Sequence, residues 1–531
     1  MISTGTGGEQ DGGAILVAAT GDLTLRGQFD ITSNVLGEES EGGSGGEISL
    51  QGRSVLLEQT QGAANASNIS SFTATAGRGA DVSIVAEGTL TVSGEHAITS
   101  STVGTGMAGA VVLRGGDIAV SAASPTTLSS SSLGVGDAGR VDMLAEGALF
   151  LSGVEVGSIA ADQGAAGVIR ASGSSIEIEN ATFSTATGAN DINSSPGQIT
   201  LEAGGELGVR ESFLQSSTGG LAPAGQVRMT AGTALTLDNV SVQSASTGDG
   251  ASGSILVSSA GSVSIDGVDT ELLTNSQGAN DAGDVSIVAG DVLRFEGGGF
   301  VQTSAVGSGN AGTILLSADE VQLNWARIEG TSENAGGGDI NIFGRDIYLD
   351  SDPASGGIVF ITASSASSDA DGNGGSITLG DPAAPADLVL VRNSGLTASA
   401  NAGNGGLIDI NAASFLRDAR SVFQVTSTLG EEGSLEINSP EQDISAAVTE
   451  LDVAILDATN LIQDRCAKSA SGGSSLVITG HSTVPETDDD YLASPFVLSG
   501  TEDGGASLHS EGNPSAGMQL VLTQSWGSKC D

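Results

Sequence analysis

One stretch of the chain has residue types that could do nucleophilic chemistry. In SSLVITGHSTVP, residues 474–485, an apolar strand runs directly into Gly480, His481 and Ser482. A hydrolase nucleophile elbow needs Gly-x-Ser-x-Gly, because close packing at the sharp turn excludes side chains two positions on either side of the serine. Val484 occupies the second glycine position, and no alternation of strands and helices would bring one of the three histidines to the serine. We therefore predict no catalytic residue in this chain.

A second stretch has the ligand types of a calcium loop. Asp369, Asp371 and Asn373 follow the spacing Asp-x-Asp-x-Asn-Gly. Calcium takes several oxygen ligands, and an EF-hand loop completes them with a glutamate at its end, where this chain has Gly380. The alternative is an elongated turn, because Asp, Asn, Gly and Ser are the residues that turns prefer. The three residues are thus a candidate metal site with an incomplete ligand set, and we expect no cofactor elsewhere.

Cys466 and Cys530 are the two cysteines of the chain. In an oxidising environment they could pair, and closing a loop of about 65 residues would stabilise the fold by about 4 kcal/mol in the chain-entropy model. Two free thiols are the alternative. The sequence has no C-x-x-C spacing of the kind that indicates a zinc or redox site.

The amino-acid composition excludes several classes of function. With 81 glycines, 3% aromatic and 15% charged residues, the chain differs from ordinary globular domains, yet 38% hydrophobic residues can form a folded core. Acidic residues outnumber basic ones by 64 to 17, and the net charge of -47 repels phosphate backbones and anionic lipid. We expect no nucleic-acid partner. The chain also lacks the run of about 18 apolar residues that would predict a membrane span.

An internal repeat dominates the first 439 residues. A glycine followed by a short alternating strand recurs fifteen times with a mean spacing of 30 residues. These anchor glycines are Gly13, Gly46, Gly79, Gly109, Gly139, Gly167, Gly197, Gly225, Gly253, Gly283, Gly312, Gly338, Gly375, Gly406 and Gly433. In the unit from Gly197, three short segments alternate apolar and polar residues with a period of two, so each unit is expected to form three strands.

Three strands per unit with a constant phase predict an all-β fold, a right-handed parallel β-helix (solenoid) of about 15 coils over residues 1–439. At about 4.8 Å per coil the rod would be roughly 70 Å long. Small aliphatic residues would fill its narrow interior, and glycine would supply positive φ and close backbone approach at the corners. An up-and-down antiparallel barrel is the structural alternative, but it calls for tight Asn-Gly or Asp-Gly turns between strands.

The repeat ends near Ser439, and residues 440–531 are predicted to form a separate C-terminal module. Residues 457–466, DATNLIQDRC, could form a short helix with Asp457 as its N-cap. The strand of residues 474–480 follows, and then a flexible, acidic, Gly/Ser-rich tail.

The repeats and this terminal segment together resemble the C-terminal portion of filamentous-haemagglutinin-like exoproteins of the bacterial two-partner secretion system. In that family, the end of the β-helix is followed by an Asp-Ala, Leu-Ile and Cys segment, a strand, a Gly-rich turn and a Pro-containing acidic stretch. The matching residues are Asp457, Ala458, Leu461, Ile462, Arg465, Cys466, residues 474–476, Gly480 and Pro485. Residues 481–483 are His-Ser-Thr where the family has Arg-Gly-Gly.

The resemblance implies a secreted rod at the cell surface of a Gram-negative bacterium, with adhesin or haemagglutinin activity. Its partners would be an outer-membrane pore for export and a host cell, neighbouring cell or matrix as the adhesive target. The family's signal peptide and N-terminal secretion domain are not found here, because MISTGTGGEQDGG has neither a basic nor an apolar segment. We therefore interpret the chain as a C-terminal fragment or one with a misassigned start.

An enzyme is the alternative class, because β-helices also form polysaccharide lyases and hydrolases. Such a site needs carboxylates clustered with arginine on neighbouring coils, whereas the arginines here occur mostly once per coil at shifting positions, as at Arg53, Arg78 and Arg114. The few aromatic residues also predict no sugar-stacking surface. Serine runs such as residues 129–132 are expected to form outward-facing ladders of hydroxyl groups.

Overall fold

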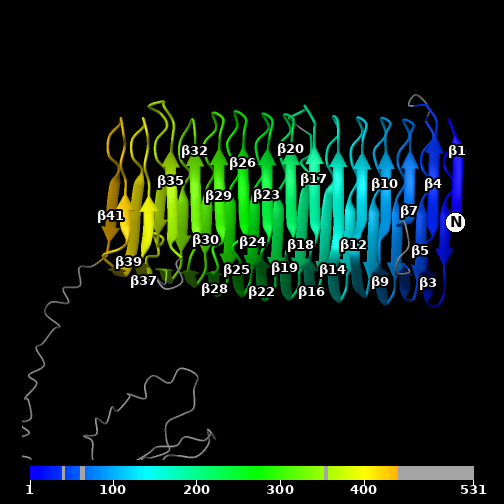
Figure 1. Cartoon of the computed structure of the whole chain (residues 1–531), viewed down its shortest axis with the longest axis horizontal. Helices are drawn as coiled ribbons and strands as arrows, with labels where there is room; N and C mark the ends of the chain where they lie inside the picture. Colours follow the sequence, from blue (N-terminus) through cyan, green and yellow to red (C-terminus); the bar gives the residue numbers. More distant parts are fainter. Residues whose placement is uncertain (39–41, 60–65, 193, 352–356, 440–531) are drawn as a thin grey trace, which may run out of the picture. The chain divides into compact units, whose positions relative to one another are not determined.

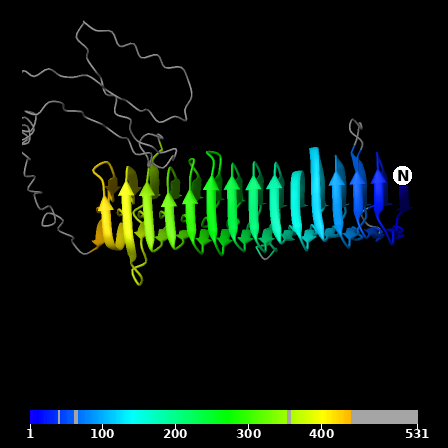
Figure 2. The same ribbon diagram turned by 90° about the horizontal axis from the view of Figure 1, so that it is seen from below.

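The computed structural model describes residues 1–439 except 39–41, 60–65, 193 and 352–356. In these residues every named element is a β-strand and none is a helix. The strands stack in chain order along one axis, from β1 (Ile2–Gly7) to β41 (Ser434–Asn438), as Figure 1 shows. Viewed at right angles, each coil again lies beside the next along the same axis (Figure 2).

Most complete coils are built from three strands, which pair only with strands of the neighbouring coils. The coil from Gly197 consists of β18 (Gln198–Ala203), β19 (Glu206–Arg210) and β20 (Phe213–Thr218). They pair in parallel with β21 (Val227–Ala231), β22 (Ala234–Asp238) and β23 (Ser241–Ser246) of the next coil. All pairings between the named strands are parallel. The predicted parallel β-helix is thus confirmed, and the antiparallel barrel is wrong.

The strands fall into three columns, which we call first, second and third strands by their order in the coil. One first strand follows each of the fifteen anchor glycines: β2 (Ile15–Ala18), β5 (Ile48–Gly52), β8 (Val82–Ala86), β11 (Val111–Gly115), β13 (Val141–Ala145), β15 (Val168–Gly173), β18, β21, β24 (Ile255–Ser259), β27 (Val285–Ala289), β30 (Ile314–Ser317), β33 (Ile340–Phe343), β36 (Ser376–Leu379), β39 (Leu407–Arg417) and β41. The second strands are β3 (Leu23–Arg26), β6 (Val55–Glu58), β9 (Thr89–Ser93), β16 (Ser175–Glu179), β19, β22, β25 (Ser262–Asp266), β28 (Val292–Phe295), β31 (Glu320–Leu323), β34 (Asp346–Asp350) and β37 (Ala386–Arg392). The third strands are β1, β4 (Asp30–Leu36), β7 (Ser67–Thr73), β10 (His96–Thr102), β17 (Thr182–Thr187), β20, β23, β26 (Glu271–Ser276), β29 (Phe300–Ala305), β32 (Arg327–Ser332), β35 (Val359–Ser365), β38 (Ser394–Thr397) and β40 (Val422–Gln424). The long strands β12 (Asp117–Ser132) and β14 (Ala148–Ala160) serve as second and third strands at once, and β39 continues from first to second.

Aliphatic side chains stacked in columns fill the interior. Ile199, Val227, Ile255 and Val285 occupy equivalent positions on successive first strands, and all four are fully buried. The period of two along each strand directs alternate residues inward, so Val, Ile and Leu from every coil contact the same residue types in the next. Few aromatic residues are needed because the cross-section is narrow.

The third strands place hydroxyl groups inside the solenoid, which corrects one expectation. Ser129 and Ser131 face outward and their hydroxyls lie 2.7 Å apart, but Ser130 and Ser132 are fully buried. A run of serines in a strand alternates faces like any other sequence, so only half of the run forms the outward ladder. The inward hydroxyls form a continuous column through Ser33, Ser71, Ser100, Ser130, Ser158, Thr185, Ser216, Ser244, Thr274 and Thr303.

This column explains why the repeat begins with glycine. The Gly139 N–H donates to Ser130 Oγ at 2.8 Å, and that hydroxyl donates to the carbonyl of Gly109 in the preceding coil at 2.7 Å. A Cβ on Gly139 would lie 2.2 Å from the Gly109 carbonyl oxygen. No anchor glycine has positive φ. The anchors are therefore required for close stacking of the coils, and the positive φ expected at the corners belongs to other residues.

Candidate functional site

The structure describes only part of the residues singled out by sequence. Ser482, His481, Cys466 and Cys530 lie outside the described residues, so the predicted module, the disulfide and the absence of a catalytic serine remain predictions. Asp369, Asp371 and Asn373 lie in the loop between β35 and β36, and they can be compared with the requirements of a calcium site.

The loop that contains Asp371 and Asn373 is held by hydrogen bonds between coils. Asn373 Oδ1 accepts from the backbone N–H of Asn404 at 2.8 Å, and its carbonyl accepts from the N–H of Gly337 at 2.9 Å. Asp371 and Asn373 line an open hollow of about 610 Å³. Among the described residues, no group of three or more His, Cys, Asp or Glu side chains is arranged to hold a metal ion. Calcium binding at Asp369, Asp371 and Asn373 remains a prediction.

Asp and Asn side chains also accept backbone hydrogen bonds in the loops between the third strands and the next first strands. Asp281 Oδ1 accepts from the N–H of Asn310 at 2.7 Å, and Asn310 Oδ1 accepts from that of Gly336 at 2.9 Å. Asn404 Oδ1 accepts from the N–H of Glu431 at 3.0 Å. Each side chain satisfies a backbone donor of the next coil that no strand partner reaches. Asp281, Asn310 and Asn404 are therefore turn residues of the solenoid.

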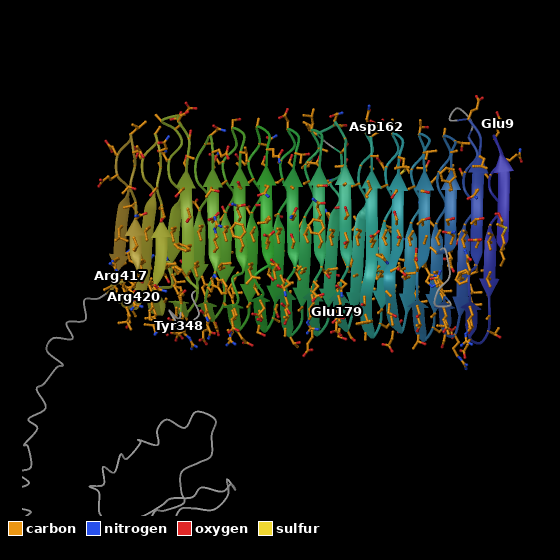
Figure 3. All side chains as sticks on the ribbon, in the orientation of Figure 1. Glu9, Asp162, Glu179, Tyr348, Arg417 and Arg420 are labelled. Atoms are coloured by element: carbon orange, nitrogen blue, oxygen red, sulfur yellow. The ribbon has the colours of Figure 1, made fainter. Side chains whose placement is uncertain are left out.

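Many of the charged side chains link neighbouring coils. Arg170 pairs with Glu202 at 2.7 Å across adjacent first strands, and Arg210 pairs with Glu177 at 2.9 Å across adjacent second strands. All four side chains are substantially exposed, and such pairs contribute about 0–1 kcal/mol each. Polar side chains project from both edges of the solenoid, with Asp162 on the upper edge and Glu179 on the lower edge in Figure 3.

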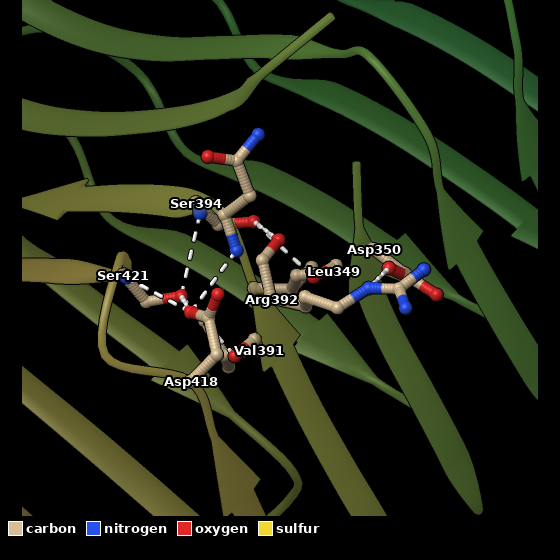
Figure 4. Close-up of polar contacts among 8 residues, drawn as sticks. Leu349, Asp350, Val391, Arg392, Ser394, Asp418 and Ser421 are labelled. Atoms are coloured by element: carbon tan, nitrogen blue, oxygen red, sulfur yellow. Dashed lines mark hydrogen bonds and ion pairs between the residues drawn. The ribbon is translucent and has the colours of Figure 1, made fainter. Parts of the chain in front are cut away.

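The corner after the second strand is held by similar contacts near the C-terminal end of the described solenoid. Asp418 accepts from the hydroxyl of Ser421 at 2.5 Å and from its N–H at 2.9 Å, while Ser421 Oγ also lies 3.1 Å from the Val391 carbonyl (Figure 4). The hydrogen bond from the Ser421 hydroxyl, with further backbone N–H donors, lowers the pKa of Asp418 despite some burial. In the same column, Arg392 of the preceding coil pairs with Asp350.

One column of carboxylates comes closest to the arrangement that an enzyme would need. Asp238 and Asp266 are direct neighbours in the register of β22 and β25, and Glu296 follows β28 in the next coil. Burial, and then the charges of Glu296 and Asp238, raise the pKa of Asp266, while Ser264 and Arg294 oppose the shift. Like charges on one face hold a proton more readily, which is a property of acid catalysts. These three carboxylates, however, line neither the hollow at Asp371 and Asn373 nor the one at Glu211 and Asp269.

His96 is enclosed in the core. It is 1% exposed on β10, with Nε2 3.1 Å from the Ser93 carbonyl and its ring 5.6 Å from that of Phe29. Nδ1 has no hydrogen-bond partner among the described residues. Burial lowers the pKa of His96, and the hydrogen bond to Ser93 opposes this only partly. Enclosed in this way, the imidazole serves the core and is not available to a ligand on the surface.

Aromatic residues gather on one surface that was not predicted from the sequence. Phe300, Arg327 and Phe360 are lateral neighbours at the starts of β29, β32 and β35, on the outward face of three successive coils. Trp325 lies two residues before Arg327. Trp325 and Phe360 are 39% and 48% exposed, and no other aromatic side chain among the described residues is as exposed. We call Phe300, Trp325, Arg327 and Phe360 the aromatic patch.

The backbone of Trp325 is in the left-handed region, with φ of 56°. A residue at or just beyond the end of the second strand has positive φ in many coils, and elsewhere it is usually glycine or asparagine: Gly27, Gly94, Gly153, Asn180, Asn239, Gly267, Gly297 and Asn393, with Glu211 the other exception. A bulky residue in this region is an outlier, and such strain concentrates at functional sites. The patch is therefore the strongest candidate functional site in the described residues.

Comparisons with known proteins do not identify this chain. No family model, no curated protein and no solved structure matches it. Among the described residues there is also no helix with the length and apolarity needed to cross a membrane.

Proposed function

We propose that this chain is the solenoid portion of a secreted, rod-like adhesive exoprotein, displayed at the surface of a Gram-negative bacterium. In this proposal a dedicated outer-membrane partner pore exports the chain, and the solenoid then presents its outward face to a host cell, a neighbouring cell or a matrix. The resemblance of residues 457–485 to two-partner secretion exoproteins supports the export route.

The stacked architecture supports a role as a rigid scaffold. Each coil is bonded to the next through three parallel ladders, and many of the charged side chains that cross between coils are paired. A solenoid of this kind holds surface residues in fixed register over many coils. The net charge of -47 keeps such a rod solvated and separated from other copies.

The single observation that carries the adhesive function is the aromatic patch. Exposed aromatic residues with a nearby arginine are the residue types enriched in contact surfaces. Here two exposed aromatic side chains lie in adjacent coils of a chain with only 3% aromatic residues. A random distribution of so few aromatic residues would not need to place two exposed ones in adjacent coils. A contact surface does need them side by side.

The test is binding of the purified full chain to bacterial cells, animal cells and extracellular matrix. We expect saturable binding that falls at least tenfold in the double variant Trp325→Asn, Phe360→Thr. Phe213→Ser is the matched control, because Phe213 occupies the equivalent outward position on β20, outside the patch. Ser482→Ala should leave binding unchanged.

The enzyme alternative has its own outcome in the same experiment. If the purified chain degrades an extracellular polysaccharide, and Asp266→Asn abolishes that activity, the adhesive proposal is overturned in favour of a lyase or hydrolase. The Asp238, Asp266 and Glu296 column is the place where that activity should map.

A further inference from the structure

We propose that the aromatic patch binds a neutral oligosaccharide by stacking the apolar faces of sugar rings on Trp325 and Phe360. This inference rests on the proposed adhesive function and names the class of ligand for its contact surface. Four features of the patch support it: the support of the rings, the strain at Trp325, the polar groups beside the rings and the charge of the surface.

Glycines in the neighbouring coils support the two exposed rings and leave no room for other side chains. A Cβ at Gly298 would lie 3.3 Å from the indole ring of Trp325, and one at Gly357 would lie 2.4 Å from the Trp325 Cβ. On the other side, a Cβ at Gly395 would lie 3.2 Å from the ring of Phe360. Each ring therefore rests against backbone and keeps part of its surface in solvent. A fixed, partly exposed ring loses little conformational entropy when a ligand stacks on it.

The indole is placed by the strained corner. With φ of 56°, Trp325 turns the chain into β32, and its carbonyl accepts from the N–H of Gly298 at 2.9 Å. Except at Glu211, equivalent corners are made by glycine or asparagine, which adopt this conformation at lower cost. The tryptophan is thus costly for folding at this position, and a contribution to binding accounts for its presence.

Polar groups suited to sugar hydroxyls lie beside the rings. The Arg327 guanidinium is 4.9 Å from the Phe300 ring centroid, and its Nε donates to Glu329 Oε1 at 2.5 Å. Gln302 Nε2 donates to the other carboxylate oxygen at 3.2 Å. Of the guanidinium nitrogens of Arg327, only Nε has a hydrogen-bond partner among the described residues. The terminal N–H groups are therefore available to donate to a hydroxyl. Planar side chains held in this way give the directional contacts that orient a polar ligand.

The charge of the surface favours a neutral ligand. Glu329 is only 9% exposed and its carboxylate is matched by the Arg327 charge, so the patch has no unpaired positive charge for a uronate or sulfate. The net charge of -47 repels anionic polymers and a second copy of this chain alike. Coils are spaced by about 4.8 Å, so Phe300 and Phe360 lie about 10 Å apart, which suits several linked sugar units better than one.

The experiment measures tryptophan fluorescence of the full chain. The chain has two tryptophans, so Trp526→Phe leaves Trp325 as the single reporter. Neutral polysaccharides, namely dextran, galactomannan and soluble β-glucan fragments, are titrated in parallel with polygalacturonate as the anionic probe. We expect a saturable shift with at least one neutral polymer and none with polygalacturonate.

Two substitutions separate binding from folding. Phe360→Thr should weaken the fluorescence response at least tenfold. Trp325→Asn, which suits the left-handed corner, should weaken binding at least tenfold when binding is followed by co-sedimentation, with the unfolding midpoint unchanged or raised. Phe213→Ser should bind normally.

The remaining outcomes overturn the inference. Cell binding that depends on Trp325, without a response to any neutral polysaccharide, refutes the glycan and leaves the adhesive function standing. An equal response to polygalacturonate refutes the neutral class. Self-association that Trp325→Asn abolishes would show that a second copy is the partner. If the unmodified chain shows neither cell binding nor a response to any glycan, both proposals are refuted.

Discussion

The backbone N–H of Gly139 donates to Ser130 Oγ at 2.8 Å, and the same hydroxyl donates to the carbonyl of Gly109 one coil earlier. Similar contacts occur at Ser158 with Gly139 and Gly167, and at Ser216 with Gly197 and Gly225. One buried hydroxyl therefore satisfies a donor and an acceptor at a corner where the strand ladders are interrupted. This relationship links the anchor glycines of the repeat to the serines nine residues before them.

Replacing Ser130 with alanine should lower the free energy of unfolding by about 2 kcal/mol, because it leaves the Gly139 N–H and the Gly109 carbonyl unsatisfied in a buried corner. Urea unfolding followed by circular dichroism measures the change. Ser129→Ala is the matched control one residue away, and as an outward-facing change it should stay within about 0.5 kcal/mol. Equal losses in the two variants would contradict the role of the internal column.

Gly139→Ala should destabilise the solenoid by about 3 kcal/mol, since the added Cβ would lie 2.2 Å from a backbone oxygen that cannot move without parting two coils. Gly208→Ala is the control, because a Cβ there has nothing within 4 Å and the residue lies within β19. Alanine in a strand should gain about 0.5 kcal/mol over glycine. The prediction fails if both variants unfold at the same urea concentration.

The fold could be predicted from the sequence because one local rule repeats. Each anchor glycine precedes a first strand, and at thirteen of the fifteen anchors a Cβ would lie less than 3.0 Å from a neighbouring atom. The alternation of residues after the glycine then indicates which face of the strand points inward. The inward hydroxyls were not predicted because Ser129 and Ser130 look alike until the face of each is known. The aromatic patch was missed for another reason: Phe300 and Phe360 become neighbours of Arg327 only through the register between coils of unequal length.

The corner residue Glu211 is a site where stability should rise. Its φ of 47° is a left-handed conformation, which asparagine and glycine adopt at this corner in other coils. Glu211→Asn should raise the free energy of unfolding by about 1 kcal/mol. Glu206→Asn, at the start of β19, has no positive φ and should give no gain. A loss of stability at residue 211 would show that the glutamate side chain itself stabilises the corner.

The buried His96 should make stability depend on pH. Burial lowers its pKa from the usual value of 6.5, so the folded state favours the neutral ring. Its contribution to stability is therefore present above pH 6.5 and is lost as the pH falls through the lower folded-state pKa. The urea midpoint should fall between about pH 7.5 and about pH 5.5. His96→Thr, which introduces the residue type that Thr126 has at the equivalent position of the next coil, should largely remove this fall, because the inward position then carries no titratable group. Replacing His481 and His509 with glutamine controls for the other histidines, and a wild-type pH dependence in His96→Thr would refute the assignment.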